Sequence, residues 1–174
     1  YDGVGALRDV GQNHLLQMLA LIAMDAPKSF DSASIRESRA RILEKLPRYS
    51  LEKASELSFR GQYKGYTEIE GVSSKSKTET YFKIKTFINS PRWEGVPFTL
   101  ESGKRMKETL KEIVVTFKHP TPCLCKNDEH FSNQIIFRLE PKEEILVSLF
   151  AKKPGLKNEI EEKKIHFVYR EEEL

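Results

Sequence analysis

The chain has 174 residues, 39% of them hydrophobic and 32% charged, which excludes a disordered chain and favours a globular domain with a real core. The formal net charge is +3, and the basic and acidic residues are interleaved, which excludes the basic stripe typical of a nucleic-acid binder. The longest apolar run, Met18 to Met24, is far too short to span a membrane.

The cellular setting is indicated by the start of the chain and by its cysteines. No basic and apolar leader opens the sequence, so nothing indicates secretion, and a start at Tyr1 leads us to expect a piece of a larger protein. Cys123 and Cys125 are separated by one residue, a spacing that makes them poor disulfide partners. We therefore expect a reduced, cytoplasmic setting.

Residues 5–24 carry the strongest helical pattern. Apolar side chains recur there at near-helical spacing, at Leu7, Val10, Leu15, Met18, Leu19 and Ile22. Polar side chains crowd the first two turns, among them Asp9 and His14. A lone helical histidine is commonly structural, but it titrates near neutral pH and is able to act as a general base. On an ideal α-helix Asp9 and His14 are about 140° apart, so the pattern predicts that they flank a ligand rather than touch.

A second helix is expected at 35–46, with Ser34 as its cap and Pro47 as its end. From residue 57 the apolar pattern becomes the alternation that is typical of strands. These strands are expected at 57–63, 80–88, 111–118, 135–139, 145–150 and 160–169. Short connections favour antiparallel pairing. We therefore predict an α+β fold, in which two N-terminal helices (about 5–46) pack on a large, mainly antiparallel β-sheet (about 57–169) within a single domain, 1–174.

Several stretches of the chain resemble one enzyme family. They are YDGVGALRDVGQNHLLQ at 1–17, RGQY at 60–63, NSPRWEGVPF at 89–98, GK at 103–104 and KKPG at 152–155. Together they resemble the C-terminal portion of the glucose-6-phosphate dehydrogenases, over residues 1 to about 169. The N-terminal coenzyme-binding domain of the family, with its Gly-rich loop, is not in this sequence. Its His-Tyr-x-x-Lys segment, which holds the sugar phosphate, is also missing.

The resemblance implies specific roles for three residues. His14 occupies the place of the base that takes the proton from the anomeric hydroxyl, Asp9 that of a sugar ligand and Lys104 that of a sugar-phosphate ligand. The intact protein is then expected to oxidise D-glucose 6-phosphate to 6-phosphogluconolactone in the pentose phosphate pathway. Its coenzyme, NADP or NAD, is bound mainly by the absent N-terminal domain. The 174-residue chain alone is expected to be inactive, because catalysis needs all of these groups in one geometry.

Three positions depart from the family pattern. Thr109 stands where the family places a second basic residue against the substrate, and we hypothesise that Lys107 or Lys111 supplies the missing charge. Glu101 and Glu140 stand where members with a second, structural NADP carry other residues. Carboxylates repel the phosphates of a dinucleotide, so the sequence argues against such a second site.

A metal site and the mode of assembly are the remaining questions. His119, Cys123, Cys125 and His130 invite a zinc interpretation, but Cys-x-Cys is tighter than the usual spacing of structural sites, and a variable loop explains the segment equally well. We expect no metal. Family members dimerise through the large sheet, so a homodimer is expected. The alternative to an enzyme fragment is a non-catalytic module that binds a sugar phosphate or a protein partner.

Overall fold

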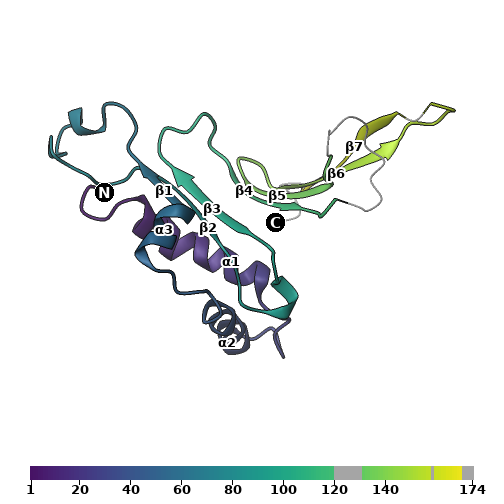
Figure 1. The fold of residues 1–174 in the computed structure, drawn as a ribbon, viewed down its shortest axis with the longest axis horizontal. Coiled ribbons are helices and arrows are strands. Elements are labelled where there is room, and N and C mark those ends of the chain that lie inside the picture. The colour runs from purple at the N-terminus through teal and green to yellow at the C-terminus, as the bar shows by residue number, and fades with distance from the viewer. Residues whose placement is uncertain (120–130, 158, 170–174) are drawn as a thin grey trace. The chain divides into compact units, whose positions relative to one another are not determined.

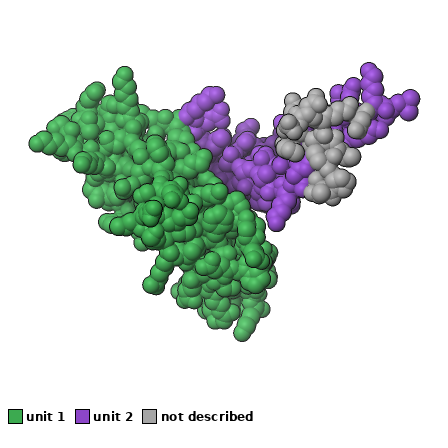
Figure 2. Space-filling model, viewed as in Figure 1, with its two compact units in different colours: residues 1–106 green, residues 107–174 purple. Residues whose placement is uncertain are grey.

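The computed structural model describes residues 1–119, 131–157 and 159–169. The chain forms two compact units, residues 1–106 and residues 107–174, which are coloured separately in Figure 2. Within the described ranges, the strands form a three-stranded and a four-stranded antiparallel sheet rather than one continuous sheet (Figure 1). The predicted α+β class, with the longer helices ahead of most of the strands, is confirmed. The single domain expected for residues 1–174 stays a prediction.

The predicted first helix has two parts of different winding. A π-helix, η1, spans Leu7–Leu15, and the α-helix α1 follows directly over Leu16–Ala23. The change is seen where the backbone N–H of Leu16 donates to the carbonyl of Gly11, five residues back instead of four. The expectation of one regular α-helix over 5–24 is therefore wrong in its winding.

The second helix, α2, spans Ser32–Leu43, so it begins earlier than the sequence predicts. Its cap is Asp31 and not Ser34, because the carboxylate of Asp31 accepts from the backbone N–H groups of Ala33 and Ser34 at 2.9 and 3.0 Å. A third helix, α3, spans Leu51–Leu57 and was not predicted. At seven residues it is too short to show a helical period.

The first unit is completed by a sheet in the order β1-β2-β3, whose strands are Ser58–Gly61, Tyr81–Thr86 and Phe98–Gly103. Two short 3₁₀ turns, η2 (Tyr66–Glu68) and η3 (Pro91–Trp93), lie in its connections. The central strand β2 buries Phe82 completely and Thr86 almost completely, as a strand covered on one face should. η1 packs against β3, which places the helix along this sheet (Figure 1).

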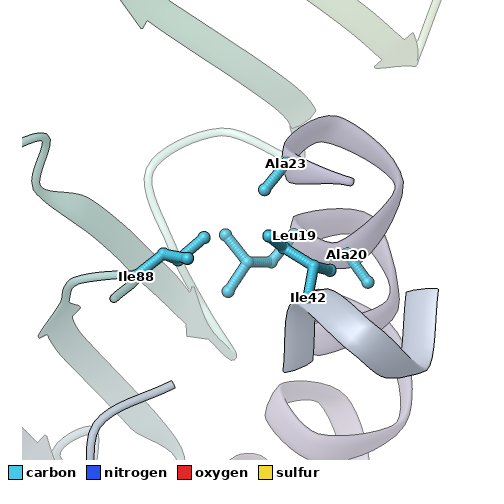
Figure 3. Close-up of a cluster of buried hydrophobic side chains, with 5 residues drawn as sticks. All are labelled: Leu19, Ala20, Ala23, Ile42 and Ile88. Carbon is cyan, nitrogen blue, oxygen red and sulfur yellow. The ribbon is translucent and has the colours of Figure 1, made fainter. Parts of the chain in front are cut away.

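The core of this unit joins α1, α2 and the segment after β2. Its buried side chains are Leu19, Ala20, Ala23, Ile42 and Ile88 (Figure 3). Trp93, which the sequence marks as part of a rigid corner, packs against this cluster. Its indole N–H donates to the carbonyl of Ala23 at 2.8 Å. The 89–98 turn thus anchors the end of α1 to the sheet.

The second unit is a four-stranded antiparallel sheet in the order β4-β5-β6-β7. Its strands are Lys111–Thr116, Gln134–Glu140, Glu144–Lys152 and Ile160–Val168. The described part of this unit contains no helix. Nor does any helix in the described ranges of the whole chain have the length and apolarity needed to cross a membrane.

Candidate active site

The three residues singled out in the sequence all lie in the first unit. Asp9 and His14 are on η1, and Lys104 follows the last residue of β3. All three side chains are exposed to solvent. Because η1 packs against β3, the helix and the end of this strand bring the three residues to one region of the same compact unit.

The π winding changes the relation between Asp9 and His14. In a π-helix the hydrogen bonds join residues five apart, so residues at that spacing lie roughly one turn apart on the same side. Asp9 and His14 are five residues apart within η1. The prediction that they stand about 140° apart assumed 3.6 residues per turn and is wrong for this helix. The carboxylate and the imidazole therefore share one face of η1.

The start of η1 is held by a distant carboxylate, that of Glu79. The backbone N–H of Leu7 donates to Glu79 Oε1 at 3.0 Å, and the N–H of Ala6 donates to the Glu79 carbonyl at 3.0 Å. Gly5, with a φ of 80°, lets the chain pass close to this side chain, since a Cβ there would lie 2.4 Å from Glu79 Oε1. Glu79 thus satisfies the helix N-terminus that no side chain of the helix itself caps.

Lys104 is fixed to the same part of the chain. Its backbone N–H donates to the carbonyl of Thr80 at 2.8 Å. Gly103 before it lies against Tyr81, because a Cβ at Gly103 would be 2.7 Å from the Tyr81 ring. The Lys104 ammonium stands 4.0 Å from the centroid of the Tyr1 ring, in a cation–π contact.

Tyr1 connects the helix to Lys104. Its hydroxyl donates to the Glu79 carbonyl at 3.2 Å. Burial, and then the negative charges of Glu79 and Asp9, raise the pKa of this hydroxyl. Tyr1 thus links the carbonyl of Glu79, whose side chain holds the start of η1, to the Lys104 ammonium that lies over its ring.

Tyr1 also belongs to a cluster of three rings, with Tyr63 and Tyr66, which we call the tyrosine cluster. The Tyr66 ring meets Tyr1 edge-on at 6.4 Å between centroids and Tyr63 at 5.5 Å. Sequence reasoning missed both this cluster and Glu79. No spacing rule connects Leu7 to a partner 72 residues away, although Tyr63 lies in the RGQY stretch that resembles the family.

Two of the three positions that depart from the family pattern, Glu101 and Glu140, carry charges that are paired. Lys111, one candidate for the missing positive charge, forms an ion pair with Glu140. Glu101 accepts a hydrogen bond from the Tyr81 hydroxyl at 2.8 Å and pairs with Lys83 at 3.2 Å. These contacts, the tyrosine's first, hold the pKa of Glu101 below its usual value, so the carboxylate is ionised near neutral pH. The argument against a second NADP site stays a prediction.

The zinc interpretation falls mostly on the segment that is not described. Cys123, Cys125 and His130 lie outside the described residues, and only His119 lies within them. Among the residues that the structure describes, no group of three or more His, Cys, Asp or Glu side chains is arranged to hold a metal ion. The expectation of no metal therefore stays a prediction.

A family model and two relatives show which known proteins this chain is similar to. A family model described as "Glucose-6-phosphate dehydrogenase, C-terminal domain" matches residues 1–174. The glucose-6-phosphate 1-dehydrogenase of Borreliella burgdorferi is 40% identical over 181 residues, covering 97% of this chain and 38% of that protein. The enzyme of Dictyostelium discoideum is 35% identical over 174 residues, covering 98% of this chain and 35% of the relative. The chain thus spans little more than a third of the length of these relatives.

Solved structures give the same result. A crystal structure of glucose-6-phosphate 1-dehydrogenase from Mycobacterium avium matches with a TM-score of 0.84 and 34% identity, covering 98% of this chain and 36% of that one. A structure of glucose-6-phosphate dehydrogenase in complex with its substrate glucose-6-phosphate matches with a TM-score of 0.83 and 33% identity, covering 97% and 35% of the two chains.

Proposed function

Because this chain belongs to the glucose-6-phosphate dehydrogenase C-terminal domain family, we propose that it is the sugar-binding and dimerisation part of such an enzyme. The intact protein then oxidises D-glucose 6-phosphate to 6-phosphogluconolactone with NADP or NAD. The observation that carries this proposal is the placement of Asp9 and His14 on one face of η1, which packs against β3, the strand that Lys104 follows.

His14 is the base in this proposal. The neutral form of an imidazole has a ring nitrogen with a free lone pair, which accepts a proton. His14 takes the proton of the anomeric hydroxyl while C1 of the sugar gives up a hydride. In this proposal the coenzyme, NADP or NAD, is bound mainly by the N-terminal domain of the intact protein.

Asp9 and Lys104 bind and orient the sugar. The Asp9 carboxylate accepts hydrogen bonds from sugar hydroxyls, as an ionised acid does. The Lys104 ammonium has the Tyr1 ring on one side, and its N–H groups on the other side face solvent and an incoming phosphate. The backbone hydrogen bond from Lys104 to Thr80 fixes the base of the Lys104 side chain. Because the neighbouring residue, Glu79, binds the start of η1, Lys104 is fixed relative to that helix.

The test is a histidine substitution in the full-length protein. His14→Asn should lower kcat by about 10²- to 10⁴-fold, the usual contribution of a general base, with little change in KM for glucose 6-phosphate. His166→Asn on β7 is the matched control and should keep kcat. A His14→Asn enzyme of wild-type kcat would refute the role. A full-length wild-type protein that binds glucose 6-phosphate without oxidising it would favour the non-catalytic module.

The isolated 174-residue chain should not reduce NADP in the presence of glucose 6-phosphate. It supplies the proposed base and sugar ligands, while the hydride acceptor must be held by residues outside it. Reduction of NADP by the purified chain would contradict this division of the site.

A homodimer through the four-stranded sheet belongs to the same proposal. Two cross-strand rows on one face are apolar throughout: Ile113, Phe137, Ile145, Phe167, and Val115, Ile135, Val147, Ile165. Phe167 is 55% and Ile165 47% exposed. Contiguous apolar surface of this kind is characteristic of an interface. A second copy of the chain, which presents the same face, covers it in a two-fold dimer.

A cytoplasmic setting completes the proposal. It is supported by the close spacing of Cys123 and Cys125, which does not favour a disulfide.

A further inference from the structure

We infer that Arg105 supplies a second positive charge for the phosphate of the sugar substrate, beside Lys104. This inference rests on the proposed function and deepens it. The resemblance places the second basic residue at position 109, where this chain has Thr109. The structure provides another cation four residues earlier, in the same compact unit as Asp9, His14 and Lys104.

Lys104 and Arg105 lie on the same tyrosine cluster. The Lys104 ammonium stands over Tyr1 at 4.0 Å, and the Arg105 guanidinium stands over Tyr63 at 4.5 Å from the ring centroid. Both rings meet Tyr66 edge-on, so the two cations stand on rings of one cluster. Two positive charges on one cluster are suited to a phosphate dianion.

The backbone explains how two consecutive side chains reach one surface. In an extended strand, successive side chains point to opposite faces. Arg105 has a φ of 55°, and it is the only non-glycine residue with a positive φ in the described part of the chain. This left-handed conformation breaks the alternation directly after Lys104. Such a conformation is costly for a residue with a Cβ, and strained backbone of this kind is concentrated at binding sites.

The tyrosine cluster is a fixed support. Tyr66 is 4% exposed, and its hydroxyl donates to Asp2 Oδ1 at 2.8 Å. The backbone N–H of Tyr63 donates to the hydroxyl of Thr80 at 2.9 Å, and Thr80 is itself completely buried. The carbonyl of Thr80 accepts the backbone N–H of Lys104. One buried residue thus ties the ring under Arg105 to the residue that carries the first cation.

Of the two lysines that the sequence suggested, Lys111 is already paired with Glu140. Among the described residues, neither Lys104 nor Arg105 forms an ion pair with a carboxylate. Their charges are therefore available to an anionic ligand.

The chemistry of arginine suits this role. A guanidinium that lies with its face on a ring keeps its N–H donors directed outward in its own plane. Those donors match two phosphate oxygens at once, in a bidentate contact. The Arg105 guanidinium is held over the Tyr63 ring by a cation–π contact, which uses none of its N–H groups as hydrogen-bond donors to an acceptor oxygen.

The test compares two substrates that differ only in the phosphate. In the full-length protein, Arg105→Gln should raise KM for glucose 6-phosphate roughly ten- to hundred-fold, the usual effect of losing a charged hydrogen bond. Its kcat should stay within about twofold, and kcat/KM for unphosphorylated glucose should not change, because only binding to the phosphate is removed. Arg105→Lys should recover part of the loss. Lys107→Gln and Lys111→Gln are matched controls and should leave KM unchanged.

Three results would overturn the inference. The first is an unchanged KM for glucose 6-phosphate in Arg105→Gln. The second is an equal loss of kcat/KM for both sugars, because that indicates a structural role. The third is a large rise of KM in either lysine control.

Calorimetric binding of glucose 6-phosphate separates this inference from the proposed function. If the wild-type protein oxidises neither sugar, the proposed function fails, and weaker binding of glucose 6-phosphate by Arg105→Gln still supports the phosphate contact. Unchanged binding overturns it.

Discussion

Removing the carboxylate of Glu79 should loosen the helix that carries the proposed base. Glu79→Ala deletes the acceptor for the backbone N–H of Leu7, and no residue of η1 replaces it, since Ala6 at the N-cap position has no side-chain acceptor. The carbonyl of Glu79 still accepts from Ala6 in this variant. The perturbation therefore isolates one hydrogen bond and one charge at the start of η1.

The size of the effect follows from two terms. A part-buried N–H left without a partner costs about 1–3 kcal/mol. This range includes loss of the negative charge at the helix N-terminus, which is worth about 0.3–1 kcal/mol. Glu79→Gln keeps an acceptor oxygen and loses only the charge. We therefore expect Glu79→Gln to lose only the smaller contribution, about 0.3–1 kcal/mol.

Amide hydrogen exchange of the full-length protein, followed by mass spectrometry, measures the local stability of η1. Peptides covering residues 6–15 should exchange roughly 5- to 150-fold faster in Glu79→Ala, which corresponds to the expected 1–3 kcal/mol in the free energy of local opening. Glu79→Gln should show a few-fold change, and Glu70→Ala, an exposed carboxylate in the same connection, should show none. If residues 6–15 exchange as slowly in Glu79→Ala as in the wild type, the Glu79 carboxylate does not hold the start of η1, and the proposed positioning of Asp9 and His14 is wrong.

Three further changes test other parts of the structure. Gly11→Ala should destabilise the protein by about 1–3 kcal/mol, seen as a lower urea midpoint, because its Cβ would lie 2.9 Å from Cζ of the fully buried Phe82. Burial, and then the hydrogen bond to Asp2, raise the pKa of Tyr66 to about 12. Its stabilising contribution should therefore be complete below about pH 10, the ordinary tyrosine value, and disappear as the pH rises through 12; Tyr66→Phe should remove this part of the alkaline stability loss. Phe167→Lys should shift the sedimentation of the full-length protein from dimer to monomer, and an unchanged dimer would exclude this face of the sheet.

Most of the strands were predictable because their side chains alternate, and alternation is a local property of the sequence; β3, Phe98–Gly103, is not among the expected ranges. β2, β5 and β6 fall within two residues of the expected ranges. The separation of the strands into two sheets was not predictable, because the pattern records which face is apolar and not which strands pair.

The residues of the site were predictable only through the family resemblance, and their arrangement was not predictable at all. Composition and spacing mark His14 merely as a histidine on a helix. Its relation to Asp9 depends on the π winding, and the residues that position the site, such as Glu79 and Tyr63, lie far away along the chain. Contacts over such separations arise from the tertiary fold, and local sequence patterns do not predict them.

The π winding of η1 has a consequence for changes in chain length. An α-helix advances about 100° per residue, so loss of one residue between Asp9 and His14 would leave them four apart, the spacing of one ordinary α-helical turn. The pair would still face the same side, and the residues that follow His14 would keep their orientation toward the core formed by Leu19, Ala20 and Ala23. Loss of one residue at this point should therefore disturb the protein less than loss of one residue within α1, which would rotate the rest of that helix by about 100°.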